Sequence, residues 1–220
     1  MTVSALVCFI AARAPAQQLA EQAKAPAAPP APLMPITLTG DAGRGVVLAT
    51  TCGGCHGVPD SHNAYPAYHV PKLGGQNADY IEVALQGYRR GTRSHPTMQV
   101  QAATLSDQDI ADIAAYFSTY EGAPAAGKSS ASAVDIEAGK RASMPCQACH
   151  GEVGVAPAPQ WPTLAGQHES YLEQALKQYQ TGQRNDAVMG AMAKPLDSAT
   201  IAQLAAYFSS QTHLHGTEPR

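Results

Sequence analysis

The chain has 220 residues, of which 45% are hydrophobic and 14% are charged, and its formal net charge is −3. This length allows one large domain or two small ones. The mild acidity argues against nucleic acid as a partner, because proteins that bind nucleic acid usually carry a basic surface.

Residues 1–16 have the composition of an export signal. An apolar run from Val3 to Ala12 precedes the small-residue cleavage site Ala14-Pro15-Ala16, and the run is too short to span a bilayer. We expect cleavage and a periplasmic protein; a retained anchor or a lipidated Cys8 are the alternatives. Residues 17–40 are rich in alanine and proline, so we expect an extended tether there.

The segment Cys52-Gly53-Gly54-Cys55-His56 recurs 94 residues later as Cys146-Gln147-Ala148-Cys149-His150. Two thiols three positions apart lie on one side of a helical turn, so each can add to one vinyl group of a porphyrin while the histidine binds the iron. A zinc site would need two more ligands in the same half, and a disulfide framework does not fit the cysteine count. The motifs predict two covalently bound haem c groups, held by Cys52, Cys55, Cys146 and Cys149, with His56 and His150 as axial ligands.

The two halves are copies of one domain. Residues 80–117 match residues 171–208 without a gap at an offset of 91, whereas the cysteine motifs lie 94 apart. The first copy therefore has three extra residues before Pro71, in a polar segment that we expect to be a surface loop. We divide the chain into domain 1 (41–121), a linker (122–133), domain 2 (134–212) and a tail (213–220).

Both copies are predicted to be all α-helical. Helices are expected near 41–51, 78–90, 135–143 and 169–179, and closing helices begin after Ser106 and Asp197, each of which can cap a helix. The closing helices carry apolar stripes that should form the cores: Ile110, Ile113, Ala114 and Phe117 in the first copy, and Ile201, Leu204, Ala205 and Phe208 in the second.

The second axial ligand decides whether each iron relays electrons or binds a substrate. Met98 and Met189 occupy equivalent repeat positions, and a thioether is a soft ligand that favours ferrous iron. Met192, three residues after Met189, is an alternative. Rival ligands without a repeat partner are expected to be exposed loop histidines: His62, His69, His95 and His168. His213 and His215 are expected to be solvated near a frayed C-terminus.

Two further pairs of residues repeat. Pro71 and Pro162 open matching segments, and their carbonyls could accept the second ring N–H of the ligating histidines, although a simple turn would explain them almost as well. Arg93 and Arg184 each follow a glycine by two positions and could pair with haem propionates, or could be ordinary surface residues.

Together these motifs resemble the diheme cytochrome c4 family over about residues 41–210: two CxxCH motifs, PxLxGQ segments, YxxxxLxxYxxGxR helices, a methionine loop and a closing helix ending in AAYF. The resemblance implies two tandem class I cytochrome c domains whose propionate edges face each other. It implies the axial pairs His56/Met98 and His150/Met189, with Pro71 and Pro162 holding the histidines. It also implies a periplasmic carrier that delivers electrons to terminal oxidases.

We therefore expect an electron carrier without substrate chemistry, which takes electrons from a donor such as a quinol:cytochrome c reductase and meets membranes only through its partners. One alternative is the haem subunit of a complex such as a flavocytochrome c sulfide dehydrogenase. Another is a diheme enzyme such as a thiosulfate dehydrogenase, in which Lys194 or His95 could ligate an iron; a methionine in both copies argues against it.

Overall fold

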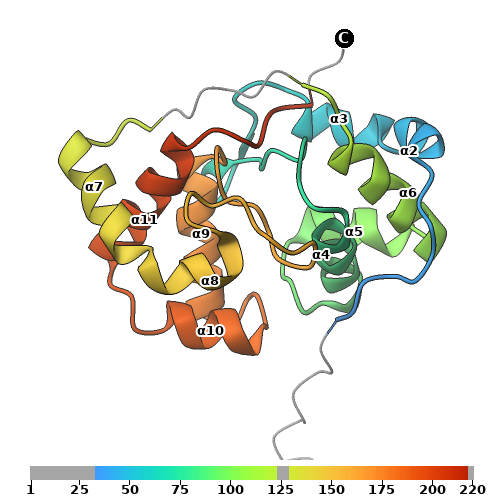
Figure 1. Ribbon diagram of the computed structural model, residues 1–220. Helices are drawn as coiled ribbons and strands as arrows, with labels where there is room; N and C mark the ends of the chain where they lie inside the picture. The colour runs from blue at the N-terminus through green and yellow to red at the C-terminus, as the bar shows by residue number, and fades with distance from the viewer. Residues whose placement is uncertain (1–32, 123–128, 218–220) are drawn as a thin grey trace, which may run out of the picture. The chain divides into compact units, whose positions relative to one another are not determined.

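The computed structural model describes residues 33–122 and 129–217. The expected export signal, Cys8, residues 17–32 of the expected tether, residues 123–128 of the linker and residues 218–220 lie outside these ranges. The described chain is mainly helical, which confirms the predicted fold class (Figure 1). Within the described ranges, no helix is long and apolar enough to cross a membrane.

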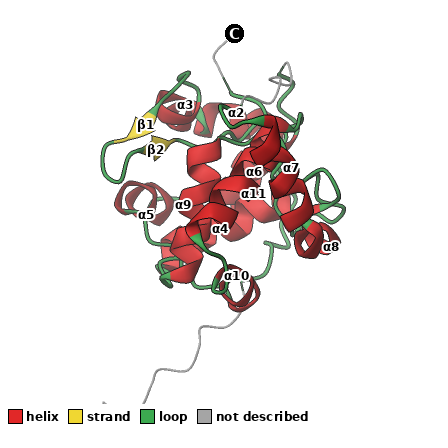
Figure 2. Ribbon diagram, turned by 90° about the vertical axis from the view of Figure 1, so that its left-hand side faces the viewer, coloured by secondary structure: helices red, strands yellow, loops and turns green. Residues whose placement is uncertain are grey.

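The helices of the first copy are α2 (Ala42–Leu48), α3 (Thr50–His56), α4 (Ala78–Arg90), α5 (Pro96–Ala103) and α6 (Asp107–Ser118). Between α3 and α4 lies a short antiparallel hairpin of β1 (His62–Asn63) and β2 (Tyr68–His69), with His62 opposite His69 (Figure 2). The second copy contains α7 (Ala133–Ala142), the 3₁₀ turn η1 (Met144–Cys146), α8 (Gln147–His150), α9 (Glu169–Gln180), α10 (Ala187–Ala193) and α11 (Ser198–Ser210).

The closing helices begin and pack as predicted. Ser106 and Asp109 form a capping box at the start of α6, and Asp197 accepts the Thr200 N–H at the start of α11. The predicted stripe of α6 is at most 2% exposed and that of α11 at most 4% exposed. Burial of these side chains contributes about 1.5–3 kcal/mol for each large residue and gives each copy its own core.

In each copy the first helix crosses the last one at a glycine (Figure 1). A Cβ on Gly45 of α2 would collide with the Asp112 carbonyl oxygen of α6, and a Cβ on Gly139 of α7 would collide with the Gln203 carbonyl oxygen of α11. The two glycines are 94 positions apart, as the cysteine motifs are. Close backbone approach therefore fixes the same crossing in both copies, and in each copy the cysteine motif lies in the short helical segment that follows this first helix.

Three segments differ from expectation. Residues 33–40 lie against the first copy instead of forming a free tether: the Ile36 N–H donates to Glu82 at 2.6 Å, and the Met34 carbonyl accepts from Gln86 at 2.9 Å. In the tail, Leu214 is 0% exposed and His215 is 8% exposed. The extra segment of the first copy forms the hairpin, which packs on α9 of the second copy. Irregular segments with local sequences typical of linkers are thus ordered by long-range contacts.

Candidate functional site

The first cysteine motif lies on one short helix. Cys52, Cys55 and His56 belong to α3, which places both thiols on the same helical turn, directly before the histidine. Cys52 is half-buried and packs against the first core, whereas Cys55 is exposed. A side chain at Gly53 or Gly54 would meet open space, so the intervening positions face away from the protein core.

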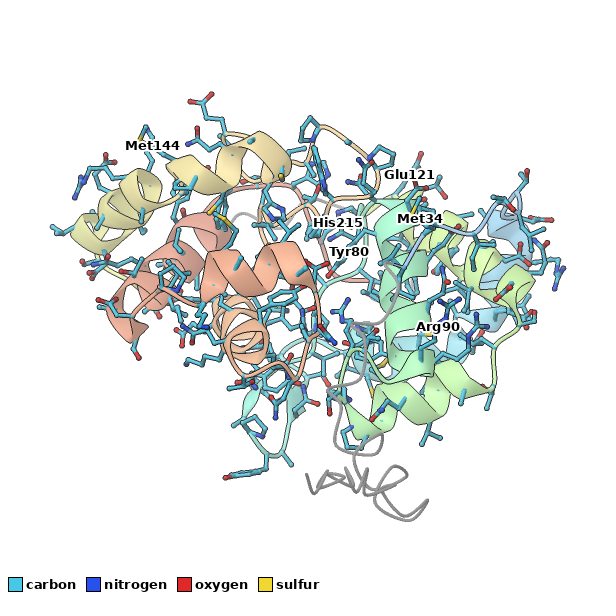
Figure 3. The ribbon with its side chains drawn as sticks, turned by 90° about the horizontal axis from the view of Figure 1, so that it is seen from below. Met34, Tyr80, Arg90, Glu121, Met144 and His215 are labelled. Atoms are coloured by element: carbon cyan, nitrogen blue, oxygen red, sulfur yellow. The ribbon has the colours of Figure 1, made fainter. Side chains whose placement is uncertain are left out.

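The second motif is built differently at its start. Cys146 ends the turn η1, and Cys149 and His150 lie on α8, so a 3₁₀ turn replaces the first part of the helix. Pro145 accounts for this change, because a proline fits the first turn of a helix but cannot donate the backbone hydrogen bond that continues one. Met144 beside it is 69% exposed and lies at the edge of the molecule (Figure 3).

Each motif histidine is oriented by a proline carbonyl of its own copy. His56 Nδ1 lies 2.8 Å from the Pro71 carbonyl oxygen, and His150 Nδ1 lies 2.8 Å from that of Pro162. Because a carbonyl only accepts, the proton sits on Nδ1 and the Nε2 lone pair is left for a metal. Burial lowers the pKa of both histidines, which keeps them in the neutral form that binds iron.

Met98 and Met189 lie at the third position of two short helices, α5 and α10, where the sequence suggested only a loop. The Met98 N–H donates to Nδ1 of the cap residue His95 at 3.3 Å, and the Met189 N–H donates to Oδ1 of the cap residue Asp186 at 2.8 Å. Both methionines are half-buried. The rival Met192 is 38% exposed, and Lys194 is exposed.

Arg93 and Arg184 meet where the two copies touch. Their backbones pair as an antiparallel bridge, and the flanking Ser94 N–H donates to the Gln183 carbonyl at 2.8 Å. Both guanidinium groups donate to one phenol, Tyr171 Oη, at 3.2 and 3.3 Å. Arg184 is 5% exposed, so the alternative that it is a surface residue is wrong.

The repeat partners Tyr80 and Tyr171 contribute to this arginine cluster, and sequence reasoning missed them. Arg93 donates to Tyr80 Oη at 3.2 Å, and Tyr80 lies between the two copies (Figure 3). Burial raises the pKa of Tyr80. Burial would also raise the pKa of Tyr171, but the charges of Arg184 and Arg93 together lower it to about 8. Their position as the first aligned residues of the repeat was the signal that could have identified both.

The arginine cluster, Arg93 and Arg184, keeps unused hydrogen-bonding capacity. Arg93 Nε is shielded from solvent without a hydrogen-bond partner, and within the described ranges neither arginine forms an ion pair with a carboxylate. Two guanidinium groups so close together repel each other unless negative charge lies beside them. Haem propionates supply such a charge, and arginine binds carboxylates through two parallel hydrogen bonds. The two guanidinium groups at this interface therefore fit the carboxylates of haem propionates.

Most rival histidines are engaged in protein contacts instead of being exposed. The His69 N–H donates to Ser170 Oγ at 3.0 Å, and His69 Nδ1 lies 2.8 Å from the same oxygen. The His69 ring stacks on that of His168 with centroids 4.5 Å apart, and His95 Nε2 lies 2.9 Å from Asn63 Oδ1. His62 is exposed, as expected. In the tail, His213 is half-buried, and His215 Nε2 lies 3.0 Å from the Gly122 nitrogen and 2.9 Å from the Tyr120 carbonyl oxygen. These contacts, which join segments far apart in sequence, had no signal in the repeat.

The comparisons with known proteins agree with this geometry. A family model described as cytochrome c matches residues 40–121 and 136–212. Cytochrome c4 of Pseudomonas aeruginosa is 35% identical over 180 residues, covering 76% of this chain and 87% of the relative. A thiosulfate dehydrogenase electron acceptor of Stutzerimonas stutzeri is 33% identical over 176 residues, covering 74% of this chain and 79% of the relative.

Among solved structures, reduced recombinant cytochrome c4 from Pseudomonas stutzeri superposes with a TM-score of 0.68 at 32% identity, over 79% of this chain and 100% of that chain. A match of this length and identity covers both cysteine motifs and both closing helices. The chain therefore belongs to the cytochrome c family and, within it, to the diheme cytochromes c4, and it is an electron carrier with two covalently bound haem c groups.

Proposed function

We propose that this chain is a periplasmic carrier with two closed haem irons, ligated by His56 and Met98 in domain 1 (41–121) and by His150 and Met189 in domain 2 (134–212). One observation carries the proposal. Both copies hold the motif histidine on a proline carbonyl at 2.8 Å, with His56 half-buried and His150 buried, and both hold a half-buried methionine at the third position of a capped helix. The same constellation built twice favours two irons with the same ligands.

The protein's residues set the conditions for electron transfer. The haem supplies the one-electron chemistry. Cys52, Cys55, Cys146 and Cys149 fix it covalently, and the proline carbonyls hold the histidine rings in one tautomer and orientation. Arg93 and Arg184 meet where the copies touch, and there they would pair with haem propionates and offset their negative charge. An electron that enters one domain can then pass to the other inside a single chain.

For the finer role, we propose a donor such as a quinol:cytochrome c reductase and an acceptor such as a terminal oxidase. The formal charge of −3 becomes more negative with four propionates, which suits a protein that docks transiently on basic surfaces of its partners. Haem attachment at CxxCH motifs and the signal-like residues 1–16 support the periplasm.

The ferric absorption spectrum tests this proposal. Protein produced with haem maturation should show the methionine-sulfur-to-iron charge-transfer band at the intensity of two haems, and the reduced protein should not change its spectrum with carbon monoxide. Met98→Ala should remove half of the band and open one iron to carbon monoxide, and Met189→Ala should remove the other half. Met192→Ala, as the matched control, should leave the band unchanged. A band of half intensity in the wild-type protein would overturn the closed-iron proposal.

A second candidate role is to accept electrons from a dehydrogenase of sulfur compounds. It is favoured by the relative in Stutzerimonas stutzeri, which is named as the electron acceptor of a thiosulfate dehydrogenase, and by the match to the cytochrome subunit of a sulfide dehydrogenase in Chlorobaculum tepidum. Gel filtration of the native protein tests whether such a role would involve a stable complex. A free carrier elutes at the mass of one chain, whereas a haem subunit elutes with a flavoprotein partner.

A further inference from the structure

Two buried glutamines cross between the copies. Gln76 and Gln167 end the matching PxLxGQ segments, and they are 5% and 4% exposed. Each side chain leaves its own copy and holds the backbone of the other. Gln167 accepts the Lys72 N–H at 2.9 Å and donates to the Lys72 carbonyl at 3.0 Å. Gln76 accepts the Thr163 N–H at 2.9 Å and donates to the Thr163 carbonyl at 2.9 Å.

The peptide groups that these glutamines hold are the ones that orient the iron ligands. The Lys72 N–H and the Pro71 carbonyl belong to one planar peptide unit, and that carbonyl binds His56 Nδ1 at 2.8 Å. In the second copy, the Thr163 N–H and the Pro162 carbonyl form the equivalent unit, and that carbonyl binds His150 Nδ1 at 2.8 Å. One peptide thus connects a glutamine of one domain to the histidine of the other.

The orientation of each carboxamide is fixed by a second donor. Gln76 Oε1 also accepts the Asn77 N–H at 2.9 Å, and Gln167 Oε1 also accepts the His168 N–H at 3.0 Å. An oxygen can accept from two N–H groups and an amide nitrogen cannot, so the assignment of oxygen and nitrogen in both side chains is unambiguous. The acceptor end of each glutamine therefore faces the peptide N–H.

We propose that Gln167 is a positioning residue for His56 and that Gln76 is a positioning residue for His150, so that each domain adjusts the iron of the other. This inference rests on the proposed function, because it requires both histidines to be iron ligands. Hydrogen bonds in a chain polarise one another, and an acceptor on the N–H side makes the carbonyl of the same peptide a stronger acceptor. A stronger bond at Nδ1–H raises the electron density of the imidazole and favours ferric iron. Each glutamine therefore lowers the reduction potential of the haem in the opposite domain.

Replacement by methionine tests the crossed effect, because it keeps the volume of the side chain and removes both hydrogen bonds. Gln167→Met should increase the ratio of ferrous to ferric iron in domain 1 about three-fold at a fixed potential, a shift of ~28 mV at 59 mV per tenfold change. Gln76→Met should do the same in domain 2. Gln86→Met is the matched control: Gln86 is also buried in domain 1, at 4% exposed, but it binds the Met34 carbonyl and no peptide beside an iron ligand.

Redox titrations assign each step when they are repeated in a Met189→His background, where imidazole ligation lowers the potential of haem 2 and separates the two steps. In that background, the step at higher potential belongs to haem 1 and the step at lower potential to haem 2. Gln167→Met should raise the midpoint potential of the first, and Gln76→Met that of the second. The Nδ1–H resonance of the histidine in the opposite domain should move in the same variants, which a loss of packing alone would not cause. Gln167→Glu gives the rescue, because a glutamate retains an acceptor for the Lys72 N–H in either protonation state. The potential of haem 1 should then not rise.

The outcomes distinguish failure of the crossed glutamine effect from failure of the iron-ligand assignment. If each methionine variant shifts the haem of its own domain, or shifts both haems equally as a loosened interface would, the crossed assignment is wrong. If Gln86→Met causes the same shift as Gln167→Met, the effect is one of packing and the proposal fails as well. If Met189→His leaves both potentials in place, or if the wild-type protein lacks the charge-transfer band of two haems, the ligand assignment itself fails. Both of these ligand tests can be carried out before any glutamine variant is made.

Discussion

The two copies share a helical frame but differ in what surrounds the motif histidine and the repeated methionine. In the first copy, residues 33–40, the hairpin and the C-terminal segment 213–217 all pack around the frame, and Thr217 Oγ1 donates to the His56 carbonyl at 3.2 Å. In the second copy, the chain after His150 turns back at Gly151, whose φ is 79°, and the loop closes on itself through the Leu164 N–H and the Gly154 carbonyl at 2.7 Å. The first site thus also contacts the N-terminal and C-terminal segments, whereas the loop after His150 is held in part by its own backbone.

The caps of the methionine helices differ in the same way. His95 caps α5 and reaches the hairpin through Asn63, whereas its repeat partner Asp186 caps α10 with a carboxylate and has no hairpin beside it. Pro96 starts α5, and Ala187 starts α10. The two copies thus share the placement of the histidine and the methionine and differ in their supports, and this difference is where we expect the two haems to acquire unequal potentials.

The largest expected effect comes from breaking the helix crossing that both copies share. Gly45→Ala and Gly139→Ala should each destabilise the protein by about 3 kcal/mol or more, because the added Cβ collides with a backbone carbonyl that cannot rotate away. Chemical unfolding followed by circular dichroism measures the loss. Gly54→Ala is the control, because its Cβ meets open space and the second copy already has Ala148 there. A Gly45 variant as stable as the control would show that the crossing tolerates more separation than the structure indicates.

A second prediction tests how strongly the fold depends on the C-terminal segment. Leu214→Ala should cost about 3 kcal/mol, because the side chain is 0% exposed and its removal leaves a cavity. Leu38→Ala, at a leucine that is 45% exposed, should cost less than about 0.5 kcal/mol. Thermal unfolding of both variants gives the comparison. Equal stability of the two would mean that the segment does not pack on the protein in solution.

Much of this arrangement could be predicted from the sequence, because it is periodic. The stripe ending at Phe117 and its counterpart ending at Phe208 repeat in register, and the capping residues Ser106 and Asp197 are of types that bind backbone N–H groups locally. The cysteine motifs carry their chemistry in a spacing of three residues. Local chemistry and periodicity were therefore sufficient for the fold class and for the cofactor.

The parts that could not be predicted depend on contacts between distant segments. His215 was expected in a frayed tail, but it pairs with Gly74 across 141 positions, and no local pattern encodes such a contact. The hairpin was interpreted as a surface loop because its sequence is polar, yet Tyr68 is 6% exposed against α9. The crossing glutamines were visible as a repeated residue, but a repeat gives no indication of which copy a side chain contacts.

A smaller effect, on stability at acid pH, is expected where the copies differ just before α4 and α9. His168 occupies the position of Asn77, and burial, together with the charge of Lys72 and the neighbouring His69, lowers its pKa from 6.5 to about 4. Between these two values the unfolded chain binds a proton that the folded chain does not, so stability falls as the pH falls through this window and is fully present above it. His168→Asn should remove about 1–2 kcal/mol of that acid-induced loss, allowing for solvent screening.

Urea unfolding at pH 7.5 and at pH 4.5 measures this difference. The variant should resemble the wild-type protein at the higher pH and exceed its stability at the lower one. An unchanged loss between the two pH values would assign the acid sensitivity to other groups.

The smallest predicted effect distinguishes the two methionine helices. Removal of either cap, by His95→Ala or Asp186→Ala, should cost its helix about 1 kcal/mol. Loss of the His95 side chain should cost about 1 kcal/mol more than loss of the Asp186 side chain, because His95 makes a second hydrogen bond. His95 Nδ1 accepts the Met98 N–H, so the ring proton lies on Nε2, which donates to Asn63 Oδ1 at 2.9 Å. The rate at which added imidazole displaces methionine from each ferric iron reports both losses, and about 1 kcal/mol corresponds to a five-fold change.

Asn63→Ala alone should accelerate displacement at haem 1 and leave haem 2 unchanged, because only the first copy connects its methionine helix to the hairpin. Equal acceleration at both haems would show that the hairpin stabilises the interface as a whole and does not act through His95.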